Sequence, residues 1–192
     1  QSLGNPPDTK AAQVSKIDLD DPETLDGILA EAIDEDTLLK IGEEGAELAY
    51  APSQETPYTG WAKSRHVKAN LSQYKDGKLD GVLTSWHGNG QRRAEAHYKE
   101  GKVHGLWIRW YPNGQKMLKM SFKNGKENGL VTSWYENGQK ECEGNAKDGK
   151  RDGLETWWYE NGQKQEESNW RDDKLMSAEV WKPNGEKSPV TN

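Results

Sequence analysis

An eleven-residue stretch that recurs every 24 positions constrains the fold of this chain more than any other feature. In its third copy it reads GLVTSWYENGQ, from Gly129 to Gln139. The four copies are 81–91, 105–115, 129–139 and 153–163. A second signal, an Asp-Gly-like pair followed by Lys, keeps the same period from Asp76-Gly77 onward, with a degenerate fifth copy at Asp172-Asp173. A fixed period in the range of roughly 20 to 50 residues is the signature of a repeat array.

The composition argues against a thick two-layer core. Only 32% of the residues are hydrophobic and the mean hydropathy is -1.11, whereas globular domains have roughly 45 to 50% apolar residues when glycine is included. The chain has nine Trp and seven Tyr but one Phe. Large amphipathic rings, each covering about 150 to 250 Å², must therefore supply much of the burial.

The charge and the chain start limit the partners and leave the compartment open. A net charge of -6 argues against a nucleic-acid binder or an anionic-membrane binder, since both need a basic face. No apolar run approaches the roughly 20 residues of a membrane helix. The chain opens at Gln1 and not at Met, so it is either a processed, exported protein or a truncated chain. An exported or cell-envelope location and a cytoplasmic one both remain open.

The residues offer no catalytic or metal-binding constellation. The one cysteine, Cys142, excludes an internal disulfide, and the four histidines lack the spacing of metal ligands. Residues 144–150 resemble a phosphate-binding loop, but Arg151 stands where Ser or Thr should bind Mg²⁺. Lysines recur inside the Asp-Gly loops and would bring a cation to each supposed calcium site, so turn chemistry explains these loops better. We therefore expect no cofactor, no metal and no enzymatic activity.

The N-terminal part predicts a leader and a helical cap. Residues 1–19 contain prolines and show little periodicity, which is typical of a disordered leader. Asp21 as N-cap and Pro22 at the first helical position begin a helix whose apolar residues, from Leu25 to Ile33, recur at spacings of three and four. We expect this helix to dock on the array as part of a cap over residues 20–46. Short strands are predicted at 38–41 and 47–51.

The array is predicted over residues 47–186, with a polar tail at 187–192. At each Asn-Gly turn a two-residue loop would pair Thr84 with Glu95, placing the tryptophan side of the strand opposite charge. A three-residue loop, a type I turn closed by a left-handed glycine, pairs Thr84 with Ala94 and Ile108 with Leu118. One residue of slip moves every side chain to the other face of the sheet. The apolar match therefore favours the three-residue loop and its register.

This register predicts a core face and an aromatic face. The core face carries Val82, Thr84, Trp86 and their equivalents one to three periods later, together with Ala94, Ala96, Tyr98, Leu118, Met120, Phe122 and Cys142 of the return strands. The aromatic face carries Trp107, Arg109, Tyr111, Tyr135, Trp157 and Tyr159, opposite polar return-strand residues. Trp, Tyr and Arg dominate protein interfaces, so these six residues are the predicted partner-binding residues. Strand propensity, cross-strand packing or cover by the N-terminal helix could also place them there.

The unit WYENGQK, a strand and then KDGKxDG resembles the MORN-variant repeat of bacterial proteins grouped as the YwqK-type antitoxin family. The resemblance covers about residues 47–186 and includes the stretch from Glu55 to Gly60. It implies a twisted antiparallel sheet of successive hairpins used as an interaction scaffold, and some members resemble immunity partners of toxins. The predicted fold is therefore all-β, an elongated twisted antiparallel sheet of consecutive β-hairpin repeats with a short N-terminal helix.

The leading functional hypothesis is a non-enzymatic scaffold that binds another protein, either as an antitoxin or immunity-type partner or as a cell-envelope module. The alternative is a carbohydrate-binding module, because a row of exposed rings can stack on sugars. A third hypothesis is self-association, since the final strand leaves an open sheet edge.

Overall fold

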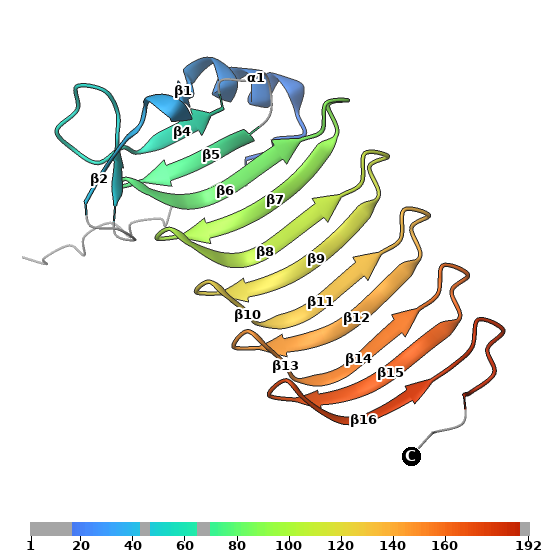
Figure 1. Cartoon of the computed structure of the whole chain (residues 1–192). Coiled ribbons are helices and arrows are strands. Elements are labelled where there is room, and N and C mark those ends of the chain that lie inside the picture. The colour runs from blue at the N-terminus through green and yellow to red at the C-terminus, as the bar shows by residue number, and fades with distance from the viewer. Residues whose placement is uncertain (1–16, 43–46, 65–69, 189–192) are drawn as a thin grey trace, which may run out of the picture.

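The computed structural model describes residues 17–42, 47–64 and 70–188 of the chain. One large sheet of consecutive hairpins dominates these residues, with a short helix and a two-stranded sheet at its N-terminal end (Figure 1). The predicted all-β hairpin array with a 24-residue period is confirmed. The predicted leader falls mostly on residues 1–16 and the predicted polar tail mostly on residues 189–192. Both ranges lie outside the described residues, as do 43–46 and 65–69.

The order of strands in the large sheet follows the order of the chain. Its strands are β1 (Ile33–Asp34), β4 (Gly60–Lys63), β5 (Asn70–Lys75), β6 (Lys78–Trp86), β7 (Arg92–Lys99), β8 (Lys102–Trp110), β9 (Lys116–Lys123), β10 (Lys126–Glu127), β11 (Gly129–Trp134), β12 (Lys140–Lys147), β13 (Lys150–Arg151), β14 (Gly153–Trp158), β15 (Lys164–Arg171) and β16 (Lys174–Val180). The short β10 and β13 lie beside β9 and β12. All pairs are antiparallel except β1 with β4, which is parallel. The sheet is therefore mixed at its first edge, because the chain reaches β1 directly from the helix.

The predicted helix is present as α1 (Pro22–Glu31). The side chain of Asp21 caps it by accepting a hydrogen bond from the Thr24 backbone N–H at 2.9 Å, and Pro22 occupies the first turn as predicted. A hydrogen bond from the Thr24 hydroxyl, together with this backbone hydrogen bond, lowers the pKa of Asp21. The two predicted short strands are also present, as β2 (Leu39–Ile41) and β3 (Leu48–Tyr50), which follow the 3₁₀ turn η1 (Glu35–Thr37) and pair antiparallel.

The Asn-Gly turns have the predicted three-residue loop. In the third unit the Gly138 N–H donates to the Tyr135 carbonyl and the Tyr135 N–H donates to the Gln139 carbonyl, both at 2.9 Å. Gly138 has a φ of 86°, in the left-handed region that glycine adopts at least cost. This is the hydrogen-bonding pattern of a type I turn followed by a left-handed glycine.

The Asp-Gly turns on the opposite edge are the tighter ones, although the sequence predicts a looser turn there. Lys147 pairs directly with Lys150, so that only Asp148 and Gly149 form the loop. Both have positive φ, 52° and 85°, as the two-residue type I′ hairpin requires. Asp and Asn tolerate this conformation better than other non-glycine residues, which explains their recurrence at this position.

The predicted strand register is wrong, because a bulge follows each Asn-Gly turn. Ser133 pairs with Cys142 and Trp134 with Lys140, which leaves Glu141 as an extra residue in the return strand. The same shift in the other units pairs Thr84 with Glu95 and Ile108 with Lys119, in place of the predicted Ala94 and Leu118. A bulge adds one residue to one strand, so every return-strand side chain lies on the face opposite to the predicted one.

The sheet therefore has two faces that differ from the predicted ones. We call the first the helix face, because α1 covers its first unit. It carries Val82, Thr84, Trp86, Leu106, Ile108, Trp110, Leu130, Thr132, Trp134, Leu154, Thr156 and Trp158 with the polar residues Glu95, Lys119, Glu143 and Glu167. We call the second the hairpin face, because β2 and β3 cover its first unit. It carries Trp107, Arg109, Val131, Ser133 and Trp157 with the apolar residues Ala94, Ala96, Leu118, Met120, Phe122 and Cys142.

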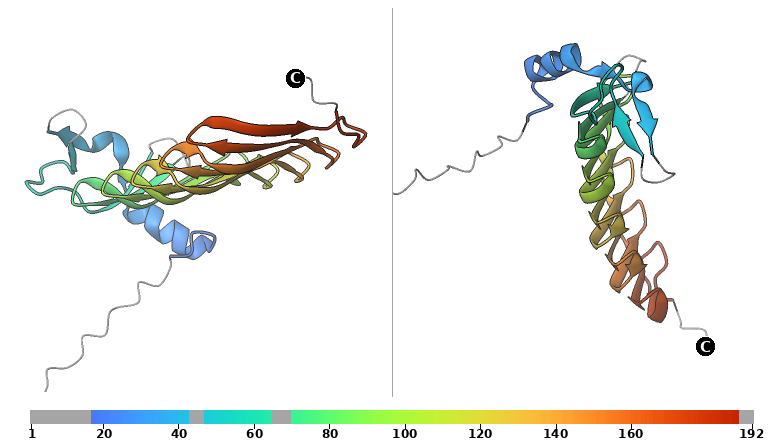
Figure 2. Two further views of the ribbon diagram at one scale, coloured as in Figure 1. Left: turned by 90° about the horizontal axis from the view of Figure 1, so that it is seen from below. Right: turned by 90° about the vertical axis from the view of Figure 1, so that its left-hand side faces the viewer.

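The principal core lies at the N-terminal end of the sheet, with one apolar cluster on each side of β4 and β5. On the helix face, Leu19, Ala32 and Leu71 are buried together under α1. On the hairpin face, Ala49 of β3 packs with Ala62 of β4 in the second cluster. Figure 2 shows α1 and the β2–β3 hairpin on opposite sides of the sheet, while the later units extend away as a single layer.

The sheet ends at β16, whose seven residues are all exposed. A further turn of the Asn-Gly kind follows it, with the Gly185 N–H donating to the Lys182 carbonyl at 2.8 Å. Lys187 then bridges back to Trp181. Self-association through this open edge stays a prediction. Within the described ranges, α1 and η1 are both too short to cross a membrane.

Candidate interaction surfaces

Three of the six predicted partner-binding residues lie together on the hairpin face. Trp107 in β8 packs its ring against Phe122, with 5.7 Å between the ring centroids. Arg109, two positions further along the same strand, is exposed. Trp157 in β14 is 37% exposed, and its indole N–H donates to the Glu155 carboxylate at 3.0 Å. The hairpin face thus presents two aromatic side chains and a cation from units two and four.

Small residues occupy the hairpin face between these side chains. Gly144 and Ala146 of β12 are buried, and Cys142 is 8% exposed. A Cβ added at Gly144 would lie 3.1 Å from the Glu155 side chain, so that Glu155 packs closely over the strand. Burial, with a smaller contribution from Glu155, raises the pKa of the Cys142 thiol to about 12. The thiol is therefore neutral and occupies this position as a small apolar side chain.

A stacked cation extends the hairpin face towards the C-terminus. The Arg151 guanidinium lies 3.4 Å from the centroid of the Trp170 ring. It also lies 4.0 Å from the Glu155 carboxylate and 3.8 Å from that of Asp173. Arginine held flat on an aromatic ring presents its edge for hydrogen bonding. The sequence does not indicate this contact, which joins β13 to β15.

The other three predicted partner-binding residues lie in the Asn-Gly turns. Each tyrosine hydroxyl donates to a tryptophan carbonyl of the following unit: Tyr111 to Trp134 at 2.8 Å, Tyr135 to Trp158 at 2.7 Å and Tyr159 to Trp181 at 2.9 Å. His87, at the same position in the first unit, places a ring nitrogen 2.9 Å from the Trp110 carbonyl. The 24-residue spacing of the tyrosines therefore has a structural cause, a hydrogen bond from each turn to the next.

Asparagines make a parallel set of bonds between the turns. The side-chain amide of Asn137 donates to the Glu160 carbonyl at 3.1 Å, and Asn89, Asn113 and Asn161 do the same in their units. Partial burial of the hydroxyl and the nearby Glu141 and Glu160 raise the pKa of Tyr135. We call these tyrosine and asparagine bonds the turn ladder. The sequence shows that the tyrosines and asparagines of the turn ladder recur every 24 positions. It does not show that they form hydrogen bonds between the turns.

The helix face is exposed where the sequence predicts a core. Leu106, Leu130 and Leu154, one per unit, are 37%, 48% and 52% exposed. The threonines between them are better buried, with Thr132 4% and Thr156 7% exposed. The sheet is a single layer at these units, so that the long side chains project into solvent while the short ones are covered by their neighbours.

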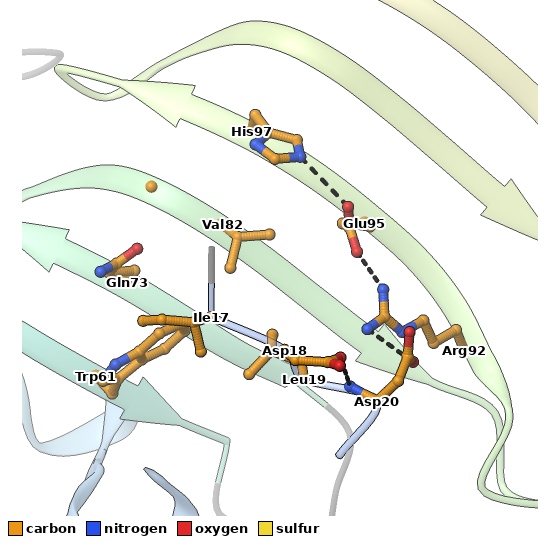
Figure 3. A pocket seen from close by; sticks show the side chains of 11 residues that line it. Ile17, Asp18, Leu19, Asp20, Trp61, Gln73, Val82, Arg92, Glu95 and His97 are labelled. Carbon is orange, nitrogen blue, oxygen red and sulfur yellow. Dashed lines mark hydrogen bonds and ion pairs between the residues drawn. The ribbon is translucent and has the colours of Figure 1, made fainter. Parts of the chain in front are cut away.

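Two hollows flank the segment that leads into α1. The first, of about 480 Å³, is lined by residues 17–20 and by side chains of β4 to β7 (Figure 3). Along it, Asp20 pairs with Arg92 at 2.8 Å, Arg92 pairs with Glu95, and Glu95 lies 3.3 Å from the His97 ring. The second, of about 580 Å³, lies between the start of α1 and the turns that follow Trp86 and Trp110. No group of three or more His, Cys, Asp or Glu side chains in the described part of the chain could hold a metal ion.

The structure defines the class of protein as a β-hairpin repeat scaffold. The features that define it are the single-layer sheet, the fixed period and the hydrogen bonds from turn to turn. The MORN repeat variant matches four consecutive stretches of this chain, at residues 79–100, 103–124, 127–148 and 151–172. MORN repeats generally serve as non-catalytic modules in protein or membrane-lipid interactions. None of the curated proteins compared with the chain matches it. Nothing in these findings favours the carbohydrate-binding alternative.

Proposed function

We propose that this chain is a non-enzymatic scaffold that binds another protein through the hairpin face of repeats two to four. The observation that carries the proposal is the set of Trp107, Arg109 and Trp157 on one face, outside the part that β2 and β3 cover. Tryptophan and arginine are the residue types that most often dominate binding energy at protein interfaces.

Tyr111, Tyr135 and Tyr159 belong to the proposed surface as its border at the turn edge. Their hydroxyls are engaged in the turn ladder, so that their rings and not their hydroxyls would contact the partner. Because the ladder ties each unit to the next, it would also hold Trp107 and Trp157 at a constant separation. A preorganised surface binds with a smaller entropic cost.

Two kinds of partner fit a scaffold without catalytic residues. One is a toxin, which the chain would neutralise as an antitoxin or immunity protein. The other is a component of the cell envelope. Both would be proteins, in keeping with the general use of these repeats, and the acidic net charge of -6 favours a partner with a basic contact surface.

The experiment is an affinity capture from lysate and envelope fractions of the source cells. The tagged wild type is compared with a Trp107→Ala, Arg109→Ala, Trp157→Ala variant and with a matched control, Leu106→Ala, Leu130→Ala, Leu154→Ala, on the helix face. Circular dichroism checks that all three are folded. We expect a protein that the wild type and the control retain and the hairpin-face variant loses, and its identity distinguishes a toxin from an envelope component. Equal retention by all three proteins would contradict the proposal.

A further inference from the structure

Helix α1 shows what kind of element the helix face accepts. Its residues Leu25, Ile28 and Leu29 pack around the buried cluster of Leu19, Ala32 and Leu71. The sheet contributes Trp61, Val82 and Trp86 to the same contact. In this interface the apolar side of an amphipathic helix packs on valine and tryptophan side chains of the sheet. The charged residues of the helix are exposed to solvent. The interface occupies only the first unit of the face (Figure 2).

The position of α1 shows where an interface of the same kind could continue along the sheet. Near its C-terminal end, the Leu29 carbonyl accepts a hydrogen bond from Lys63 of β4 at 2.6 Å. Near its N-terminal end, Pro22 and Leu25 line the second hollow together with Trp86 and Trp110. The N-terminal end of the helix therefore lies nearer to the second unit than its C-terminal end does. The hollow of about 580 Å³ lies where the covered part of the face ends.

Beyond this point the apolar positions of the outgoing strands are repeated without a cover in the described structure, while the position of Leu71 is taken by the charged residues Glu95, Lys119, Glu143 and Glu167. The position of Val82 is taken by Leu106, Leu130 and Leu154, which are 37%, 48% and 52% exposed. The position of Trp86 is taken by half-buried tryptophans in every later unit, Trp110, Trp134 and Trp158. Three consecutive units therefore present the pair of apolar side chains on which α1 docks in the first unit.

The repeat spacing matches the period of a helix. Each unit adds two strands, and strands lie about 4.8 Å apart, so that the face advances about 9.6 Å per unit. Seven residues of an α-helix advance about 10.5 Å. A helix that crosses the strands at close to a right angle would therefore place every seventh residue over the next unit. Leu25 and Ala32 of α1 have this spacing.

The charges on the helix face indicate which charge a helix that binds there should carry. In three units the cation is neutralised within its own unit, by the pairs Arg92–Glu95, Lys140–Glu143 and Lys164–Glu167. The second unit carries Lys116 and Lys119 at these positions, and neither forms an ion pair within the described ranges. In the first unit, Arg92 also pairs at 2.8 Å with Asp20, which directly precedes the helix cap. Lys116 and Lys119 therefore leave an uncompensated positive charge on the second unit, which favours an acidic residue on the helix that binds there.

We propose that the helix face of repeats two to four, from Leu106 to Trp158, is a docking site for an amphipathic helix of a partner protein. The helix crosses the strands, carries an apolar residue at every seventh position and has an acidic residue that meets Lys116 or Lys119. The site continues the interface that α1 makes with the first unit. It lies on the face opposite to Trp107 and Trp157, so that it does not depend on the scaffold function proposed above.

The test uses the full chain and a fluorescein-labelled synthetic peptide with the sequence of residues 17–33, which has both features of the proposed occupant. Fluorescence anisotropy should show saturable binding with a dissociation constant below about 1 mM. Leu130→Asp with Leu154→Asp should weaken binding at least tenfold, and Trp157→Ala on the hairpin face should leave it unchanged. If the double variant does not fold, Leu130→Ala with Leu154→Ala takes its place. Hydrogen exchange on the wild type then maps the peptide to β11 and β14.

Several outcomes would overturn the proposal. These are an absence of saturable binding at millimolar peptide, equal binding by the wild type and the leucine variants, and weakening by Trp157→Ala. Equal binding by the leucine variants would mean that the peptide replaces the chain's own α1. Sedimentation of the chain without peptide tests whether a second copy of the chain binds to the helix face. A dimer that the leucine variants abolish would assign the face to this second copy. Failure of the hairpin-face capture experiment has no bearing on these results.

Discussion

At the scale of single residues, the turn tyrosines illustrate how a repeated side chain can serve the array itself. Tyr135 lies in the turn of one unit, and its hydroxyl donates to a carbonyl of the next unit, that of Trp158. The bond is partly buried, so that water replaces it poorly if it is lost. Its repetition in Tyr111 and Tyr159 explains why a tyrosine recurs at this position without any requirement from a partner.

Replacing Tyr135 with Phe should lower the free energy of unfolding by about 1 kcal/mol, since it removes one hydrogen bond and keeps the ring. The measurement is urea denaturation followed by circular dichroism. Tyr98→Phe is the matched control, because the Tyr98 hydroxyl makes no hydrogen bond within the described residues, and it should change the stability little. Equal effects of the two substitutions would show that the turn ladder does not contribute to stability.

At the scale of elements, the bulge after each Asn-Gly turn decides where the apolar residues lie. It moves Leu118, Met120 and Phe122 away from the leucines of the helix face and onto the hairpin face. Each face is consequently only partly apolar, and neither can form a continuous core alone. Full burial is confined to the first units, where α1 covers one face and β2 and β3 cover the other.

Leu71→Ala should destabilise the chain by about 2 to 5 kcal/mol, because Leu71 is fully buried under α1 and the substitution leaves a cavity. Leu130→Ala, on the same face but 48% exposed, should cost less than about 1 kcal/mol. Urea denaturation of both variants tests the location of the core. A larger loss for Leu130→Ala would mean that the uncovered units, and not the capped end, carry the burial.

At the scale of the whole molecule, the array is a one-dimensional stack in which each unit mainly contacts its neighbours. The strand order follows the chain from β4 to β16. Every turn bonds to the next one through the same atoms, as Asn113 does to Glu136 and Asn137 does to Glu160. In such a stack, stability is approximately a sum of unit and interface contributions. A whole unit can therefore be removed without disturbing the pairing of the others.

Deletion of residues 129–152, one complete period, should leave a folded chain in which Tyr111 bonds to the Trp158 carbonyl. The urea m-value should fall by roughly one eighth, in proportion to the surface no longer buried. Deletion of 129–140, half a period, is the control. It removes an outgoing strand without its return strand and should abolish cooperative unfolding. Comparable unfolding of both deletions would refute the independence of the units.

Features with a local cause could be predicted from the sequence. Asp21 and Pro22 define the helix start because capping depends on a few adjacent residues. Gly138 defines its turn because only a residue that tolerates positive φ fits there. For the candidate site, the sequence predicts Trp107, Arg109 and Trp157 on one face, and the structure has them there. The two-residue Asp-Gly turns could have been recognised from the same turn chemistry.

The sequence by itself determined the 24-residue period, the glycines that the turns require and the capped helix, because each follows from short-range steric and hydrogen-bonding rules. Only the tertiary structure decided which side chains share a face, since one extra residue at Glu141 reverses the return strand and its cost or gain depends on the neighbouring strands. The tertiary structure also decided that Tyr135 belongs to a ladder and that α1 covers one unit of four, because both depend on contacts between residues far apart in the chain.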